Sequence, residues 1–302
     1  MKLRNLLASC YHQYLKSYYT IIGLCSIKRL AEIKYSQNLK GKKINWRHPM
    51  DLNEKINWLK FYSDTSMWPI FADKYRVREY IEQKGLSDSL NELYGVWDNA
   101  DDINFDALPQ SFVLKSNNGC GTVEFVRDKS RLDITATRRM LKKWLKMKFG
   151  LLTAEPHYLK IKPVIIAEAL LCAPLKTTLL DDYKVFCFNG NPYHILFCYD
   201  RKGAGQPAKY TIYDTKWMIH HNKILIHEGT DPQPEPKILD KMLKYSKILA
   251  TNIPCVRIDW YIVDDKLYFG EMTMTSAGGY DNTYSEEYLF ELGQQIELPN
   301  KY

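Results

Sequence analysis

The clearest candidates for chemistry are two acidic side chains on consecutive predicted strands near the C-terminus. Strand alternation puts Arg257 and Asp259 on one face, and a predicted hairpin brings Glu271 beside Asp259. Two carboxylates on adjacent strands repel each other unless a cation lies between them. Mg²⁺ takes oxygen ligands, commonly one or two carboxylates together with substrate phosphates. The pattern therefore indicates a magnesium site in which Arg257 can bind phosphate oxygens; a surface salt bridge is the alternative.

A lysine at the end of a second predicted strand is followed by a glycine-rich turn. Lys115 ends the apolar run that begins at Phe112, and residues 122–126 alternate like a returning strand. The turn consists of Ser116, Asn117, Asn118, Gly119, Cys120 and Gly121. Glycines let the backbone close over a ligand with N–H groups pointing at an anion. The P-loop spacing is absent, so the segment indicates a different phosphate clamp, and a plain hairpin turn is the alternative.

Two further charged side chains lie at the ends of predicted apolar strands. Lys184 opens the strand that follows Asp182. Taken alone, it is best explained as an edge-strand charge that prevents aggregation, and a lysine facing a transferred phosphate is the alternative. Glu168 lies near the end of the apolar strand over residues 163–171. Its carboxylate can accept a hydrogen bond from a ribose hydroxyl, while the following backbone contacts adenine; a capped strand end is the alternative.

The elements that position these residues are helices interspersed with hairpins. Asp51 with Glu54 predicts a capping box that opens a helix ending near Tyr62. Further helices are predicted over residues 69–84, 135–149 and 236–251, and loose helical periodicity covers residues 1–35. The hairpins are predicted over residues 112–126, 183–199 and 256–271. Because the strands do not alternate steadily with helices, the pattern predicts an α+β fold.

Composition excludes several classes of protein. The 302 residues suffice for one large domain or two smaller ones. The seven cysteines contain no C-x-x-C pair, and no H-E-x-x-H motif occurs, so we expect a reduced cytoplasmic chain without a zinc framework. The apolar run over residues 18–27 is too short to span a bilayer and does not indicate a signal peptide.

The positive charge is concentrated at the N-terminus. Residues 1–50 hold ten Lys or Arg and one acid, Glu32, a balance of +9, so the remainder of this +7 chain carries −2. Such asymmetry indicates a basic segment facing a membrane surface, a polyphosphate-linked substrate or a nucleic acid, and a solvated helix face is the alternative. Nucleic acid is disfavoured because aromatic stacking motifs are absent.

Taken in this order, these elements resemble the ATP-grasp superfamily. Its pattern is a lysine-bearing strand with a glycine loop, a strand ending in an acid, a basic residue opening the next sheet, and an Arg-x-Asp … Glu-x-Asn pair. Within it the chain resembles the TupA-like branch, named for teichuronopeptide biosynthesis. The matching stretches cover residues 46–49, 53–58, 72–78, 109–121, 182–192 and 256–279.

The resemblance implies two α+β lobes that clamp ATP, preceded by a helical N-terminal region. The expected boundaries are a basic helical segment over residues 1–50, a helical region over 51–110, a first grasp lobe over 111–171, and a second lobe with the metal site over 172–302.

It also implies a role for each matching residue. The nucleotide would be bound by Lys115, by the loop of residues 116–121 over the phosphates, and by Glu168, Ala169, Leu170 and Leu171 along the nucleoside. Lys184 would face the transferred phosphoryl group and Arg257 the acyl-phosphate. Mg²⁺ would be bound by Asp259, Glu271 and Thr273, the last standing where many relatives have asparagine. Lys74 and Arg78 would help to shape the acceptor site.

The implied activity is an ATP- and Mg²⁺-dependent ligation of a carboxylate to an amine through an acyl-phosphate. The expected substrate is a uronic acid or amino acid component of a bacterial capsule or other surface polysaccharide, on a nucleotide-linked or lipid-linked glycan. The protein would then be cytoplasmic, with peripheral contact to the inner membrane face through residues 1–50. The alternatives are a glycosyltransferase of surface polysaccharide assembly, for which the acidic pairs at 98–101 and 264–265 are poorly placed, and an ATP-grasp sugar kinase.

Overall fold

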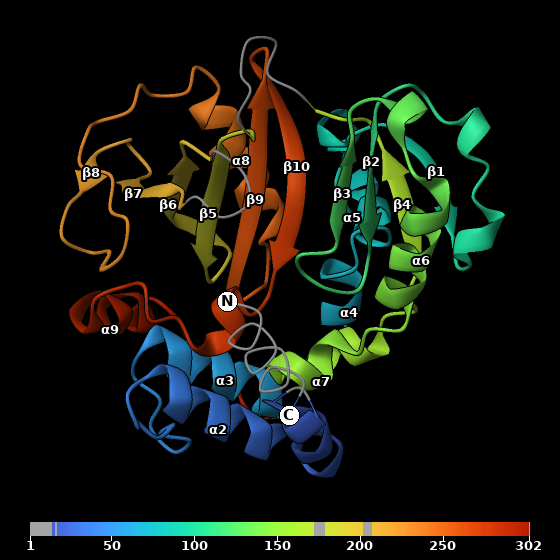
Figure 1. Cartoon of the computed structure of the whole chain (residues 1–302). Coiled ribbons are helices and arrows are strands. Elements are labelled where there is room, and N and C mark those ends of the chain that lie inside the picture. The colour runs from blue at the N-terminus through green and yellow to red at the C-terminus, as the bar shows by residue number, and fades with distance from the viewer. Residues whose placement is uncertain (1–13, 16, 172–178, 202–206, 302) are drawn as a thin grey trace, which may run out of the picture.

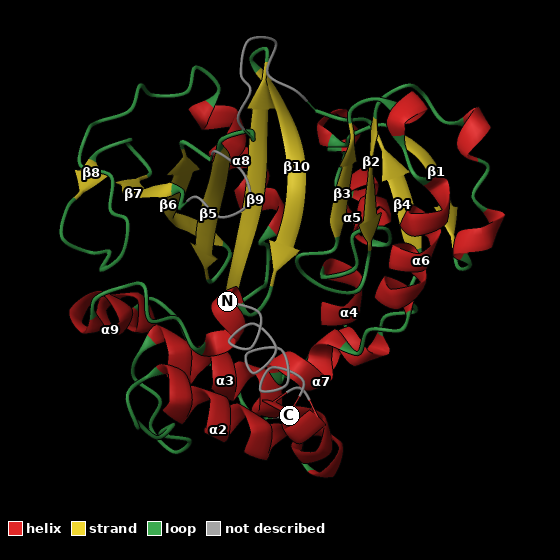
Figure 2. Cartoon of the chain, viewed as in Figure 1, coloured by secondary structure: helices red, strands yellow, loops and turns green. Residues whose placement is uncertain are grey.

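The structure, a computed structural model, describes residues 14–15, 17–171, 179–201 and 207–301. Residues 1–13 of the predicted basic segment and 172–178 at the start of the second predicted lobe lie outside the described residues. Two antiparallel sheets stand beside each other with helices around them, which confirms the predicted α+β class (Figure 2). No helix in the described ranges is long and apolar enough to cross a membrane.

The chain opens with helices, as predicted. Residues 17–25 are helical, and the next helices are α2 (Ile27–Asn38), α3 (Leu52–Tyr62), α4 (Trp68–Phe71) and α5 (Val77–Gln83). Asp51 caps α3 by accepting from the N–H of Glu54 at 2.8 Å. Glu54 does not complete a capping box, because its carboxylate accepts from the N–H groups of Asn45 and Met50 instead.

The prediction of one continuous helix over residues 69–84 is wrong in its middle part. The chain leaves the helix after Phe71 and resumes it at Val77. Between them, the carboxylate of Asp73 accepts from the N–H groups of Tyr75 and Arg76 at 2.8 and 3.1 Å, which replaces the helical hydrogen bonds. Gly85 ends α5 with a left-handed φ of 73°, as its position predicts.

The smaller sheet has four antiparallel strands in the order β1-β4-β2-β3. The strands are β1 (Leu93–Trp97), β2 (Phe112–Ser116), β3 (Val123–Val126) and β4 (Ile165–Glu168). β2 and β3 form the predicted hairpin. β1 comes from the region expected to be helical, and it pairs with β4. The helices that follow β3 are α6 (Ile134–Leu145) and α7 (Phe149–Thr153), and Leu141 of α6 packs on Phe112 and Ile165 in one buried cluster.

The larger sheet has six antiparallel strands in the order β10-β9-β5-β6-β7-β8. The strands are β5 (Asp182–Phe188), β6 (Asn191–Tyr199), β7 (Lys209–Asp214), β8 (Ile219–His220), β9 (Cys255–Val263) and β10 (Lys266–Thr273). Both predicted hairpins form, and left-handed residues make the turn between β9 and β10 at Asp264 and Asp265. Helix α8 (Leu239–Leu249) packs on this sheet through Ser246, whose hydroxyl accepts from the indole of buried Trp260 at 2.8 Å.

A helical base joins the two halves. Helix α9 (Glu286–Gln294) and α3 lie together below the larger sheet in Figure 1, and both contribute to its main core. Helix α2 forms a separate small core around Tyr35 with Tyr280 and Ala154. The short 3-10 turns are η1 (Ser87–Ser89), η2 (Ala100–Asp102), η3 (Phe105–Ala107), η4 (Lys129–Arg131), η5 (Pro156–Lys160) and η6 (Ser276–Gly279).

Candidate active site

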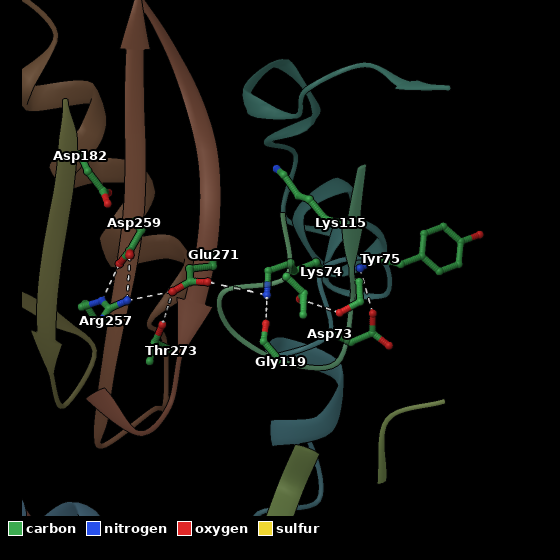
Figure 3. Close-up of polar contacts among 12 residues, drawn as sticks. Asp73, Lys74, Tyr75, Lys115, Gly119, Asp182, Arg257, Asp259, Glu271 and Thr273 are labelled. Carbon is green, nitrogen blue, oxygen red and sulfur yellow. Dashed lines mark hydrogen bonds and ion pairs between the residues drawn. The ribbon is translucent and has the colours of Figure 1, made fainter. Parts of the chain in front are cut away.

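The predicted acidic pair forms on two neighbouring strands. Asp259 of β9 stands opposite Glu271 of β10, next to an irregularity in the register. Gly270 makes this close approach possible, because a Cβ there would lie 2.9 Å from the carbonyl oxygen of Asp259. Arg257 lies between the carboxylates: Nε and Nη2 donate to Asp259 at 2.6 and 2.8 Å, and Nη2 donates to Glu271 at 2.8 Å (Figure 3). The guanidinium therefore supplies positive charge between the two acids.

Lys184 lies inside the larger sheet. Strand β5 is flanked by β6 and β9, so the edge-strand interpretation of this lysine is wrong. Its partner in register is Asp259, and its ammonium donates to Asp259 at 2.6 Å and to Asp182 at 2.5 Å. Burial by itself lowers the pKa of Lys184, but the two carboxylates outweigh burial and hold that pKa above its ordinary value. Lys184 is therefore a permanent cation beside the acidic pair.

Lys74 connects the two sheets. It lies in the turn that interrupts the predicted helix, and its ammonium donates to the carbonyl of Gly119 in the glycine loop. The same ammonium lies 3.9 Å from Oε2 of Glu271 on β10 (Figure 3). Burial would raise the pKa of Glu271, yet Lys74 and Arg257 more than compensate and lower it to about 2. The resemblance implied only that Lys74 helps to shape the acceptor site, and its contact with the glycine loop was not predicted.

The glycine loop is anchored by its own polar side chains. Ser116, Asn117 and Asn118 are buried, and their side chains bond to Thr122 at 2.6 Å and to the backbone of residues 147, 162 and 164. Cys120 and Gly121 are exposed at the tip. Among the described residues, no protein acceptor takes the backbone N–H groups of residues 118–121. The loop is thus a fixed frame whose tip presents N–H groups, the arrangement that suits an anion.

Glu168, the last residue of β4, forms ion pairs with a lysine of β2 and an arginine of α5. Its Oε2 accepts from Lys115 at 2.7 Å and its Oε1 accepts from Arg78 at 3.1 Å. Arg78 also donates to the carbonyl of Asn91 at 2.7 Å, so it lies beside β4 and away from the acidic pair on β10. The predicted ribose contact of Glu168 stays a prediction, and the two ion pairs give this carboxylate, which is only 6% exposed, partners within the protein.

The segment after β4 has only part of its backbone available for a nucleobase. The N–H of Ala169 donates to the carbonyl of Glu92 at 2.9 Å, and the carbonyl of Ala169 accepts from Asn91 at 2.7 Å. Both groups of Ala169 are therefore engaged within the protein. Of the residues predicted to line the nucleoside, the half-buried Leu170 and Leu171 are the better candidates for contacting an adenine edge.

The oxygen atoms of the acidic cluster are of the kind that Mg²⁺ prefers. Asp259 and Glu271 are partners in register, and the hydroxyl of Thr273 donates to Glu271 at 3.0 Å. The described part of the chain contains no group of three or more His, Cys, Asp or Glu arranged to hold a metal. Two carboxylates with a hydroxyl suit an ion that takes its remaining ligands from phosphates and water, which is the usual behaviour of Mg²⁺.

Asp182 is a member of the cluster that sequence reasoning did not assign a role. It is buried, its Oδ2 accepts from Lys184, and Arg201 lies 3.7 Å from the same oxygen. Its Oδ1 has no hydrogen-bond partner among the described residues. The signal was the Asp-x-Lys alternation at the start of β5, which puts both side chains on one face of the strand.

A cavity of about 390 Å³ lies elsewhere, at the helical base. It is lined by residues of α9 and by chain near the end of α2 and the start of α3, among them Lys42, Met50 and Phe290. None of the predicted nucleotide, metal or catalytic residues lines it. The candidate active site is the place where Lys74 lies between the glycine loop and the acidic cluster, called the charged junction below, because the predicted phosphate and metal residues meet there.

Several solved structures are similar to this chain. The chain is similar to the D-alanine–D-alanine ligase of Bacillus anthracis complexed with ATP, at 14% identity and a TM-score of 0.39, over 73% of this chain and 55% of that chain. It is similar to the L-amino acid ligase of Bacillus licheniformis, at 15% identity and a TM-score of 0.43, over 70% of this chain and 44% of that chain. It is also similar to the ADP complex of purK, an N5-carboxyaminoimidazole ribonucleotide synthetase, at 12% identity and a TM-score of 0.46, over 77% of this chain and 53% of that chain.

The chain thus spans about half the length of these proteins. No curated protein matches it. A family model described as TupA-like ATPgrasp matches residues 54–297, a range that includes both sheets, the glycine loop and the acidic cluster. The chain belongs to the TupA-like ATP-grasp family.

Proposed function

We propose that this protein is an ATP-dependent ligase that joins a carboxylate to an amine. The observation that carries the proposal is the position of Lys74, which contacts the glycine loop of one sheet and the acidic cluster of the other. A nucleotide bound at this junction would meet N–H groups and lysines on one side and the acidic cluster with its cations on the other. That arrangement suits phosphoryl transfer, where positioning and charge stabilisation supply most of the catalysis.

Each charged group has a role in the proposed reaction. Lys115, Lys74 and the loop tip bind the phosphates of ATP. Lys184 and Arg257 neutralise the charge that develops on the transferred phosphoryl group and on the acyl-phosphate. Asp259, Glu271 and Thr273 hold Mg²⁺, which, when bound, balances phosphate charge and polarises the γ-phosphate.

The chemical steps balance as follows. A carboxylate oxygen of the substrate attacks the γ-phosphorus, the bond from that phosphorus to the bridging oxygen breaks, and ADP leaves. The amine nitrogen then attacks the acyl carbon, the bond from carbon to the phosphate oxygen breaks, and the proton of the amine leaves with phosphate. Neither step needs a covalent bond to the enzyme, which agrees with the absence of a nucleophile motif from the sequence.

The substrate we propose is a uronic acid or amino acid component of a capsule or other surface polysaccharide, carried on a nucleotide-linked or lipid-linked glycan. The family assignment supports this choice.

The proposal includes peripheral membrane contact by the N-terminal segment. The balance of +9 over residues 1–50 and the exposed side chains of Ile21 and Leu24 support this contact. Co-sedimentation with phosphatidylglycerol vesicles but not phosphatidylcholine vesicles is the expected result; equal sedimentation with both would contradict an electrostatic contact.

The glycosyltransferase alternative gains no support from its acidic pairs. Asp98 pairs with Lys162, Asp101 with Lys142, and Asp265 with Lys237, all in exposed ion pairs. The sugar kinase alternative shares the phosphate and metal residues with the ligase. It is separated by its product, since a kinase phosphorylates a hydroxyl and forms no acyl-phosphate.

The test begins with thermal melting in Mg²⁺ plus ATP and in a panel of nucleotide-sugars. A ligand at 100 times its Kd adds about 2.7 kcal/mol to the free energy of unfolding, so binding will be visible. Uronates and amino acids are then screened for ADP release, with hydroxylamine as the trapping amine. A hydroxamate supports the ligase, ADP release without hydroxamate indicates the kinase, and a shift with a nucleotide-sugar alone would overturn the proposal.

A further inference from the structure

A stripe of polar side chains runs along the buried face of α3. Asn53, Asn57 and Lys60 are spaced four and three residues apart, which places them on one side of the helix. They are 0%, 0% and 4% exposed. Buried polar groups destabilise a fold unless they are hydrogen-bonded, and burial lowers the pKa of Lys60 to about 7, opposed by Glu155. Such a stripe on a core-facing helix therefore calls for a specific set of partners.

Most of the partners belong to one short segment after β10, and Lys60 also donates to the carbonyl of Ala154 at 3.3 Å. Asn53 donates to the carbonyl of Asp281 at 2.8 Å and accepts from the N–H of Asp281 at 2.8 Å. Asn57 donates to the carbonyl of Gly279 at 2.7 Å. Lys60 donates to the carbonyl of Gly278 at 2.8 Å and lies 3.2 Å from the hydroxyl of Tyr280. The three side chains together hold the backbone from residue 278 to residue 281.

This segment has a conformation that needs support. Ala277, Gly278 and Gly279 have φ angles of 47°, 66° and 78°, a run of left-handed residues that is unfavourable for alanine. Gly279 is required at its position, because a Cβ there would lie 2.7 Å from Nδ2 of Asn57. Thr275, at the start of the segment, is held from the other side by its hydrogen bond to buried Glu155.

The segment leads directly into the candidate active site. It begins two residues after Thr273, and the hydroxyl of Ser276 accepts from Nη1 of Arg257 at 3.3 Å. Nε and Nη2 of Arg257 donate to Asp259 and Glu271, so the bond to Ser276 engages the third guanidinium nitrogen. The orientation of Arg257 therefore depends on where the turn over residues 275–279 lies.

We propose that Asn53, Asn57 and Lys60 are positioning residues, which fix the turn over residues 275–279 and thereby the guanidinium of Arg257. The inference rests on the proposed function for the role of Arg257 at the acyl-phosphate. It gives α3, which lies outside both sheets, a part in catalysis without contact to the nucleotide.

Helix α3 also provides a matched control. Lys55 is a second lysine on this helix that donates to a backbone carbonyl, that of Ile296 at 2.7 Å, in the C-terminal segment after α9. Lys55→Met removes this one bond from the helix, whereas Lys60→Met removes the bonds of Lys60 to the carbonyls of Gly278 and Ala154 and to the hydroxyl of Tyr280. Only the bonds of Lys60 reach the turn beside Arg257.

The first measurement is amide hydrogen exchange in the full-length protein. The N–H groups of Gly278, Tyr280 and Asp281 are all hydrogen-bonded and report on the turn. We expect Lys60→Met and Asn57→Ala to speed exchange there by about tenfold or more, the effect of losing one net hydrogen bond, and Lys55→Met to leave it unchanged. Equal exchange at the turn in Lys60→Met and Lys55→Met would overturn the proposal, and Asn57→Ala decides it if Lys60→Met does not fold.

The second measurement separates positioning from a purely structural role. With the carboxylate that supports ADP release, Lys60→Met and Asn57→Ala should lower kcat by about tenfold while the KM for Mg·ATP stays within about threefold of wild type. Faster exchange with an unchanged kcat would mean that α3 only stabilises the turn, which overturns the catalytic part of the proposal. If wild-type protein binds no Mg·ATP, the proposed function fails, and the exchange comparison still tests whether α3 fixes the turn.

Discussion

Basic and acidic side chains gather in one cluster with Arg257. The basic ones are Lys74, Lys184, Arg201 and Arg257, and the acidic ones are Asp182, Asp259 and Glu271. An ionised group is costly to bury without a partner, by several kcal/mol. Opposite charges that lie side by side offset part of that cost, so these residues can pack closely at the proposed phosphate and metal site.

The acidic pair is the first target for mutation. We expect Asp259→Asn and Glu271→Gln to fold and to lower turnover by about 10²-fold or more, because each removes a preorganised charge from the transition state. ADP release under saturating Mg·ATP is the measurement. Asp265→Asn is the control, since Asp265 lies in the turn of the same hairpin in an exposed ion pair with Lys237. Near-normal turnover in both active-site variants would remove the metal assignment.

Lys74 is the second target. Lys74→Met should weaken binding of Mg·ATP by about tenfold or more, the loss expected for a hydrogen bond that involves a charged group. Titration calorimetry measures the Kd. Lys241→Met is the control, because Lys241 forms an exposed ion pair with Asp88 and has no contact with Glu271 or Gly119 in the described part of the chain. An unchanged Kd in Lys74→Met would show that Lys74 only bridges the sheets.

At the scale of elements, α9 packs closely against the start of α3. Gly293 of α9 lies against the chain that enters α3, where a Cβ would be 2.1 Å from the carbonyl oxygen of Met50 and 2.6 Å from Cα of Asp51. Both neighbours are backbone atoms, which cannot move aside as a flexible side chain can. The packing of α9 on α3 therefore depends on a residue without a side chain.

Gly293→Ala tests this packing. We expect it to lower the free energy of unfolding by about 1–3 kcal/mol, the usual cost of overpacking a buried contact. Denaturant unfolding followed by circular dichroism is the measurement. Phe290→Ala on the same helix is the control, because that side chain is 47% exposed and should cost less. Equal stability of wild type and Gly293→Ala would mean that α9 can shift without strain.

At the scale of the whole molecule, buried histidines contribute to the response to acid. His194 is 2% exposed, stacks on Phe186 with ring centroids 4.4 Å apart, and has no hydrogen-bond partner among the described residues. Burial lowers its pKa to about 3, and burial lowers the pKa of His157 to about 3 as well. In the unfolded chain a histidine titrates near 6.5. Between pH 6.5 and 3 the unfolded state binds more protons, so stability falls as pH falls through this range.

His194→Phe should reduce that acid sensitivity. One histidine contributes a slope of up to about 1.4 kcal/mol per pH unit within the window, and the phenyl ring keeps the stacking on Phe186. The measurement is the free energy of unfolding by urea at several values from pH 7 to pH 4. His48→Gln, an exposed position, should leave the slope as in wild type. A slope unchanged in His194→Phe would mean that this ring is not kept neutral by burial.

Local pattern in the sequence determined the hairpins and most of the catalytic candidates. Strand alternation places Arg257 and Asp259 on one face whatever surrounds them, and a short turn must bring Glu271 alongside. The glycine loop after Lys115 followed in the same way from an apolar run, a turn cluster and a returning strand. Such features depend on neighbours within about twenty residues, so they can be recognised without the fold.

The tertiary structure decided which of these charges meet. Strand order alone made β5 internal and turned Lys184 from an edge charge into a partner of Asp259. Lys74 meets Glu271, and Lys60 meets Gly278, across about two hundred residues of sequence. Long-range contacts of this kind depend on how separate elements pack, and a sequence pattern specifies only which face of an element is buried. The sequence therefore determined the candidate groups and their local faces, and packing decided their partners.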